Sequence, residues 1–150
     1  MPDSYIIFTL NDESYGIDIN STQEVMRLKG IVINKMPKVH EFVSGIINLR
    51  GDVVPIMNLK KRFGLEPYKG LESRIIVAEN KKILTGFLFD SILGVIEVYE
   101  EEVMTPPDDI KKQKEYVKAI VSRNKRIIYL IDVNKVIDFR TDLGAWRKLT

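Results

Sequence analysis

Short runs of apolar, β-branched residues separated by turn residues dominate this chain. Three pairs of such runs, each joined by a few polar residues, predict β-hairpins: residues 5–10 with 15–19, 74–78 with 83–89, and 116–121 with 126–131. A strand over residues 94–99 and an extended segment over residues 30–36 are also expected. The pattern predicts about nine or ten strands, at the spacing typical of small barrels or sandwiches.

Helices are expected to be few and short, because no segment has a long 3.6-residue periodicity. We expect them over residues 21–24, 41–44, 60–64 and 133–137. Ser21 and Glu24 have the spacing of a capping box, and Gly64 suits a helix C-terminus. Residues 100–114 are rich in charge and contain Pro106 and Pro107, which predicts a long exposed loop.

The run G-I-I-N-L-R-G-D-V-V-P-I-M-N-L, residues 45–59, predicts a further hairpin. With Gly51 and Asp52 as a two-residue type II′ turn, alternation gives one wholly apolar face: Ile47, Leu49, Val54 and Ile56. The opposite face is mixed: Ile46, Asn48, Arg50, Val53, Pro55 and Met57. Pro55 lacks an N–H, so its strand is expected at an edge or at a break in pairing.

The mixed face of this hairpin has two interpretations, which the hairpin alone weighs about equally. An apolar surface with an arginine as a directional anchor is typical of a protein-binding site, with Arg50 as the anchor. Alternatively, Arg50 and Asn48 simply donate hydrogen bonds to nearby backbone carbonyl groups.

Composition excludes several classes of site. The 150 residues include 23 Lys and Arg, 21 Asp and Glu, one His and no Cys, for a net charge of +2. Without cysteine there is no disulfide scaffold, thiol nucleophile, zinc ribbon or iron–sulfur cluster, and one histidine cannot form a multi-histidine metal site. Carboxylate metal sites stay open on these counts, but we expect no metal and no cofactor. No apolar run approaches a membrane span of about 20 residues, so we expect a cytoplasmic protein that does not insert into a membrane.

Several segments resemble the CheW family of chemotaxis coupling proteins. Residues 45–59 resemble the central motif of that family. The resemblance extends over nearly the whole chain through further segments in the same order: residues 5–19, 23–25, 86–90, 94–98 and 126–133. Several ordered motifs are a far more specific signal than one short pattern.

The resemblance implies a mainly β fold: one domain, residues 1–150, made of two SH3-like five-stranded β-barrels with a few short helices. It also implies a non-enzymatic adaptor. Such proteins couple the cytoplasmic tips of transmembrane chemoreceptors to the regulatory domain of the histidine kinase CheA, and they help to build the receptor array. This chain would then associate with the membrane only through its partners.

The resemblance further implies two sets of contact residues. Receptor contacts in the family lie in the groove between the barrels, and the matching positions here are Glu24, Gly45, Arg50, Ile92 and Val95, with Asn48 beside them. Kinase contacts lie on an apolar patch, which corresponds to Ile6, Ile19, Thr22 and Val25. Thr22 departs from the usual aliphatic residue, because it adds a hydroxyl.

Two alternative functions remain open from the residues alone. Small barrels often bind nucleic acid, and residues 60–62 and 123–126 are basic clusters. However, no basic stretch is interleaved with the aromatic residues that stack on bases, and a charge of +2 is weak support. The many carboxylates permit a hydrolase, but the sequence places no catalytic pair.

Overall fold

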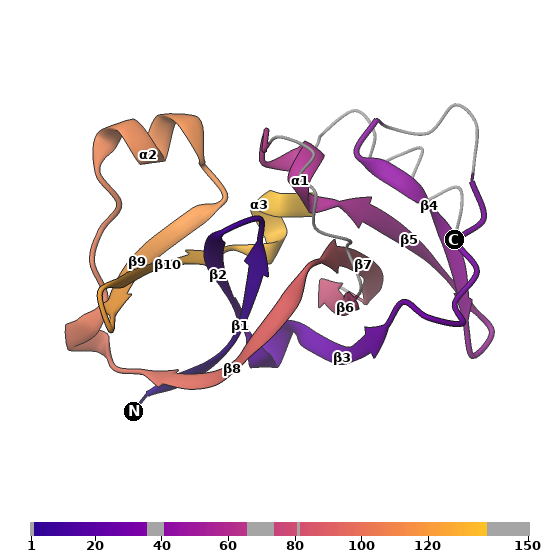
Figure 1. The fold of residues 1–150 in the computed structure, drawn as a ribbon, viewed down its shortest axis with the longest axis horizontal. Helices are drawn as coiled ribbons and strands as arrows, with labels where there is room; N and C mark the ends of the chain where they lie inside the picture. Colours follow the sequence, from indigo (N-terminus) through magenta and orange to yellow (C-terminus); the bar gives the residue numbers. More distant parts are fainter. Residues whose placement is uncertain (1, 36–40, 66–73, 81, 138–150) are drawn as a thin grey trace.

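The computed structural model describes residues 2–35, 41–65, 74–80 and 82–137, with the backbone alone at position 113. Its ten strands form two five-stranded sheets, each curled into a small barrel (Figure 1). The prediction of a mainly β fold with two five-stranded barrels and a few short helices is confirmed.

Barrel 1 combines strands from both ends of the described chain. Its strand order is β8-β1-β2-β10-β9. The bounds are β1 (Asp3–Leu10), β2 (Glu13–Asp18), β8 (Ser91–Val98), β9 (Val117–Arg123) and β10 (Arg126–Ile131). Neighbouring strands are antiparallel except β2 and β10, which are parallel.

Barrel 2 is built from the continuous segment between β2 and β8. Its strand order is β3-β6-β7-β5-β4. The bounds are β3 (Thr22–Arg27), β4 (Val43–Leu49), β5 (Asp52–Asn58), β6 (Arg74–Asn80) and β7 (Ile83–Phe89). Its one parallel pair, β5 with β7, has the same place in the order as β2 with β10. The two barrels therefore repeat one arrangement, in which β3 corresponds to β8 and the β4–β5 hairpin corresponds to the β9–β10 hairpin.

The helices are short and follow strands. They are η1 (Ile19–Ser21), α1 (Leu59–Arg62), η2 (Glu100–Glu102), α2 (Asp108–Gln113) and α3 (Val133–Ile137). The helices expected over residues 60–64 and 133–137 are confirmed as α1 and α3. Gly64 ends α1 as predicted, with φ of +69° and its N–H donating to the Lys61 carbonyl at 3.1 Å.

Three local predictions are wrong. The helix expected over residues 21–24 is strand β3, preceded by the single turn η1, because the Asp18 carboxylate caps Asn20 and β3 then pairs with β6. The helical turn expected over residues 41–44 gives way to β4, which begins at Val43. The loop expected over residues 100–114 contains η2 and α2.

The hairpin of residues 45–59 forms with a different turn. The two turn residues are Arg50 and Gly51, both with positive φ (50° and 90°), which is the type I′ pattern. The predicted faces are correct near the turn, where Ile47 and Val54 are buried and Asn48 and Val53 are exposed, but Pro55 of the predicted mixed face is buried.

The expected environment of β5 needs two corrections. Met57, predicted on the outer mixed face, is fully buried between the barrels. The strand is not at an edge, because it lies between β4 and β7. Pro55 is paired with Ile46 of β4, and the ladder to β7 begins one residue later, at Ile56.

The interface between the barrels is the largest apolar cluster. Side chains of both barrels meet there, among them Phe8, Tyr15, Met57, Phe87 and Phe89. Phe63, just after α1, stacks on Tyr116 of the other barrel with ring centroids 3.9 Å apart. Each barrel also has a smaller core of its own. Packing of this kind makes the relative position of the barrels part of the fold.

A buried ion pair also connects the barrels. Lys60 of α1 is only 3% exposed, and its Nζ lies 2.9 Å from Oδ1 of Asp90, the residue between β7 and β8. The other oxygen of Asp90 accepts a hydrogen bond from the Asn11 backbone N–H at 2.7 Å, in the β1–β2 turn. One carboxylate thus holds α1 of barrel 2 and the first hairpin of barrel 1 at the start of β8.

Candidate partner-binding surfaces

Arg50 lies at the tip of the β4–β5 hairpin and is largely exposed. Its guanidinium forms an ion pair with the carboxylate of Glu24 on β3, the strand at the opposite edge of the same sheet. Arg50 and Glu24, which are both predicted to bind the receptor, are 26 positions apart in the sequence and are brought together by the fold. The pair fixes the guanidinium and leaves its remaining donors toward solvent.

Asn48 and Gly45 support this hairpin. The side-chain oxygen of Asn48 accepts a hydrogen bond from the Gly51 N–H at 3.0 Å, which stabilises the turn that carries Arg50. Gly45 is buried, and a Cβ atom there would lie 2.4 Å from the Asn34 carbonyl oxygen. Its absent side chain lets residue 34 bridge β4, through paired hydrogen bonds between Asn34 and Ile46. In the structure Gly45 therefore shapes the hairpin from within.

Ile92 and Val95 lie on the other barrel, on edge strand β8. Val95 is 59% exposed, and Ile92 is also exposed. Exposed aliphatic side chains on one short strand segment are typical of a protein-binding surface. The predicted receptor set therefore falls into two groups: four residues on barrel 2 around Arg50, and two on β8 of barrel 1.

The predicted kinase-contact residues differ in accessibility. Ile19 is exposed on η1, and Thr22 and Val25 are half-buried on β3. The Thr22 hydroxyl donates a hydrogen bond within the chain, to the Asp18 carbonyl at 3.3 Å. Ile6 is 6% exposed and belongs to the cluster between the barrels. Three of these residues lie on one continuous stretch of backbone: Ile19, Thr22 and Val25. Ile6 lies in the core instead, and it pairs with Val95 in the ladder between β1 and β8.

Part of each set lies on corresponding strands of the two barrels: Thr22 and Val25 on β3, and Ile92 and Val95 on β8. On β3 the ladder with β6 has a bulge between Thr22 and Glu24. On β8 the ladder with β1 has a bulge at the same place, between Ile92 and Gly94. Val25 and Val95, each one residue past its bulge, therefore hold equivalent positions in the two barrels. A single sequence read without its fold gives no signal for this correspondence.

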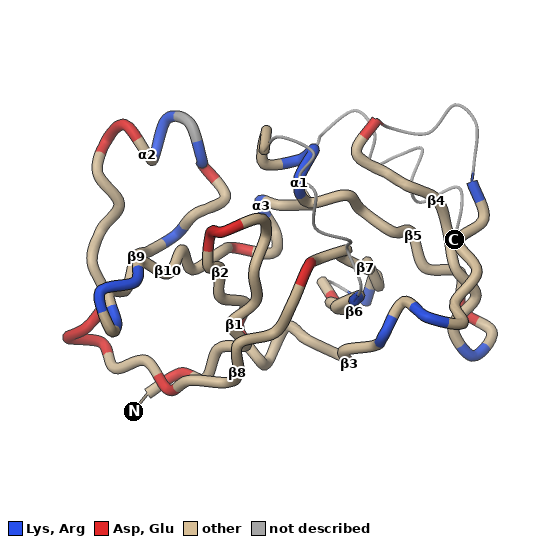
Figure 2. The backbone as a smooth tube through the Cα atoms, viewed as in Figure 1, with Lys and Arg blue, Asp and Glu red and all other residues tan. Residues whose placement is uncertain are grey.

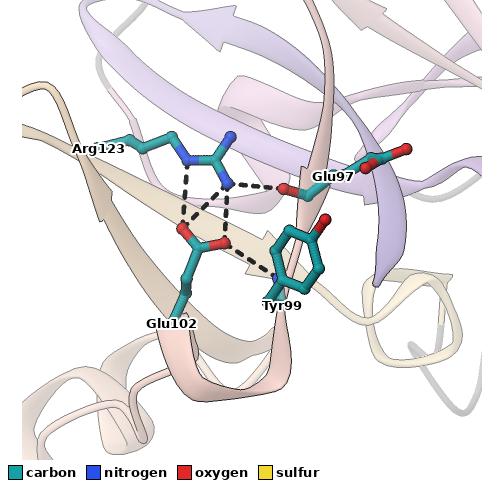
Figure 3. Close-up of polar contacts among 4 residues, drawn as sticks. All are labelled: Glu97, Tyr99, Glu102 and Arg123. Atoms are coloured by element: carbon teal, nitrogen blue, oxygen red, sulfur yellow. Dashed lines mark hydrogen bonds and ion pairs between the residues drawn. The ribbon is translucent and has the colours of Figure 1, made fainter. Parts of the chain in front are cut away.

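A polar clamp fixes the far end of β8 (Figure 3). The Arg123 guanidinium on β9 donates to both carboxylate oxygens of Glu102, at 2.9 and 3.0 Å, and to the Glu97 carbonyl on β8 at 2.6 Å. Glu102 also accepts from the Tyr99 N–H at 3.0 Å. The Tyr99 N–H and the Arg123 guanidinium together hold the pKa of Glu102 below its usual range. Sequence reasoning placed residues 100–102 in a long exposed loop and missed this clamp.

Strand β8 is thus fixed at both ends and exposed in the middle. Asp90 anchors its start to Lys60 and Asn11, and Arg123 anchors its end through Glu97. Sequence reasoning missed Lys60 as well, because it stands in a Lys-Lys-Arg run that is typical of a solvated helix surface. A rigid strand with exposed aliphatic residues loses little conformational entropy when a partner binds.

The basic clusters that supported a nucleic-acid alternative are largely engaged within the molecule. Lys60 is buried against Asp90, Arg62 donates to the carbonyls of Lys135 and Val136, and Arg123 is paired with Glu102. Figure 2 shows basic and acidic residues interspersed along the backbone. Among the described residues no group of His, Asp and Glu is placed to hold a metal ion, and no helix is long and apolar enough to span a membrane.

Comparison with known proteins agrees with this architecture. The model of the CheW-like domain matches residues 4–140. The chain is 30% identical over 142 residues to the chemotaxis protein CheW of Bacillus subtilis, covering 93% of this chain and 90% of the relative. It is 32% identical over 132 residues to CheW of Thermotoga maritima, covering 87% and 85%.

A solved structure gives the same result. The scaffolding protein TtCheW from Thermoanaerobacter tengcongensis superposes with a TM-score of 0.84 at 33% identity, covering 93% of this chain and 95% of that one. The match includes the arrangement of both barrels, since it spans nearly all of each chain. On the evidence of fold, motifs and relatives, this chain belongs to the CheW-like family of chemotaxis scaffold proteins.

Proposed function

We propose that this protein is a non-enzymatic adaptor that couples the cytoplasmic tips of chemoreceptors to the regulatory domain of the histidine kinase CheA. It reaches the receptor array through these two partners, without inserting into the membrane. The observation that carries the proposal is the family membership, joined to exposed aliphatic residues and a fixed arginine at the positions that bind partners in the family.

The receptor binds on the side of Arg50, Glu24, Ile92 and Val95. Exposed Ile92 and Val95 supply apolar area, and Arg50, fixed by Glu24, supplies directional donors. This is the composition of an interface hot spot, where a few residues carry most of the binding free energy. Asn48 and Gly45 hold the hairpin that presents Arg50.

The kinase regulatory domain binds on the side of Ile19, Thr22 and Val25, with Ile6 supporting the β1–β8 ladder from the core. The adaptor then works by geometry. The packed cluster and the Lys60–Asp90 pair hold the barrels in one relation, so that a change at the receptor is passed on to a kinase bound to the same rigid body.

The test is a kinase autophosphorylation assay with receptor fragments, with and without this protein. We expect receptor-dependent kinase activity only when the protein is present. Arg50→Glu should reduce receptor binding in a pull-down at least tenfold, because it places two carboxylates together and removes the donor. Lys125→Glu is the matched control, since position 125 is exposed in the equivalent turn of barrel 1.

Ile19→Asp is the matching test for the kinase side. Ile19 is exposed, so the variant should fold and still weaken binding to the kinase regulatory domain in calorimetry. Val25→Asp should act in the same direction but also destabilise the fold, because Val25 packs on the core. Unchanged coupling with both Arg50→Glu and Ile19→Asp would refute the proposal.

A further inference from the structure

Barrel 1 has a seam between its two edge strands, β8 and β9. These strands end the order of the sheet, and no backbone ladder joins them within the described part of the chain. At the far end the side chain of Arg123 on β9 donates across the seam to the Glu97 carbonyl on β8. An edge strand presents backbone N–H and C=O groups that can pair with another extended segment.

An apolar cavity lies in this seam. It has a volume of about 190 Å³ and is lined by Ile7, Leu93, Ile96 and Ile128, with Arg123 and Arg126 at its rim. Leu93 is the extra residue of the β8 bulge and is 52% exposed. Ile127, which lines a neighbouring cavity, is 51% exposed. Exposed aliphatic residues beside an open apolar cavity indicate a binding surface.

Arg126, the first residue of β10, separates this cavity from a polar one. It lines both, and the polar cavity also presents the hydroxyl groups of Thr9, Ser14 and Ser91. Its Nη1 donates to the Oγ of Ser14 at 3.0 Å, and Ser14 is itself buried. The guanidinium is therefore held in place by the fold and faces both cavities.

The charge around Arg126 distinguishes it from the arginines already described. Arg50 is paired with Glu24 and Arg123 with Glu102, whereas no carboxylate of the described residues forms an ion pair with Arg126. Of the acidic residues at the polar cavity, Asp12 is exposed, and Glu13 already pairs with Lys114 at 3.0 Å and accepts from the Tyr15 hydroxyl.

We propose that this seam binds an extended segment of a partner protein that carries an aliphatic residue two positions from an Asp or Glu, so that both side chains lie on the same face of the segment. The aliphatic side chain fills the cavity between Leu93 and Ile128. The carboxylate pairs with Arg126, which offers the planar fork of donors that suits it. The backbone of the segment pairs with the free edge of β8, as in recognition by strand addition. The site is separate from the Arg50 hairpin, which lies on barrel 2.

The test uses the full-length ¹⁵N-labelled protein and a capped six-residue peptide in which valine and glutamate stand two positions apart with serine between them. Amide chemical shifts of residues 93–97 and 122–128 should move on titration, and those around Arg50 should not. Arg126→Gln should weaken binding about tenfold, the effect of losing one charge-assisted contact. The matched control, Lys125→Gln, changes a neighbouring exposed charge and should stay within about twofold.

Two further measurements separate charge from packing. The same peptide with glutamine in place of glutamate should bind about tenfold more weakly. Leu93→Ser should weaken both peptides, because it removes the aliphatic wall of the cavity without touching Arg126. Absence of shift changes at about 1 mM peptide, the affinity of a very weak complex, would overturn the proposal. Equal binding of the glutamate and glutamine peptides, or an equal loss with Lys125→Gln, would overturn it as well.

Discussion

The buried pair of Lys60 and Asp90 gives the sharpest prediction about stability. Lys60 is 3% exposed, and the pair spans 2.9 Å between the two barrels. Removing one partner of such a pair leaves an uncompensated buried charge, which costs about 3–5 kcal/mol. The free energy of unfolding of a domain is only about 5–15 kcal/mol. A single substitution here should therefore remove a large share of the stability of the protein.

The perturbation is Lys60→Met, which keeps an unbranched side chain one atom shorter and removes its charge. We expect a loss of about 3 kcal/mol in urea denaturation followed by circular dichroism. The melting temperature should fall by about 6–12 °C for a chain of this size. Asp90→Asn, which can still accept from the Asn11 N–H, should cost a similar amount because it leaves the ammonium of Lys60 buried.

The double variant and a neighbouring lysine serve as controls. Lys60→Met combined with Asp90→Asn should recover much of the loss, because neither buried charge remains. Lys61→Met, on the exposed side of α1, should change stability by no more than about 0.5 kcal/mol. Losses below about 1 kcal/mol in both single variants, the value of a surface ion pair, would refute the reasoning.

Three more predictions follow from single contacts. Thr85→Val should stabilise the fold by about 1 kcal/mol in urea denaturation, because the buried Thr85 hydroxyl has no hydrogen-bond partner among the described residues. Gly45→Ala should lower the melting temperature, since the new Cβ would meet the Asn34 carbonyl; unchanged melting would contradict this. Glu102→Gln should destabilise the protein at neutral pH, and the difference should shrink as pH falls from about 4.3, because a lowered carboxyl pKa contributes stability only above it.

The strands were the most predictable part of the fold. Continuous apolar runs bounded by turn residues located both arms of the hairpin β6–β7, because a strand that is buried on both faces carries apolar residues at successive positions. The turn of the β4–β5 hairpin was harder. The predicted register pairs Val54 with Leu49, whereas the structure pairs it with Ile47. Both registers leave the same side chains facing inward, because they differ by two residues and side chains alternate faces with a period of two residues. Only the positive φ of Arg50 distinguishes the two registers.

The candidate site was predictable where it rests on family motifs and unpredictable where it rests on tertiary contact. Arg50 and Glu24 were both named from sequence, but their ion pair joins opposite edges of a sheet that no local pattern describes. In the sequence, Arg126 belongs to a basic cluster of a kind that is common in turns. Its position between two cavities depends on residues of β8, which is distant in sequence. The burial of Lys60 likewise follows from contact with Asp90, not from its neighbours along the chain.

The interrupted path of barrel 1 has a consequence for how the protein is made. Strands β1 and β2 leave the ribosome first, yet their sheet partners β8 and β10 follow only after all of barrel 2. Barrel 2 can therefore close while the first hairpin still exposes the residues that will pack in the core, among them Phe8 and Tyr15. Folding ends when residues from β8 onward arrive and complete barrel 1, a step of high sequence separation and thus a slow one. Strand β8, which carries Ile92 and Val95, joins its sheet only in this last step, so newly made protein gains the proposed docking surface only when its folding is finished.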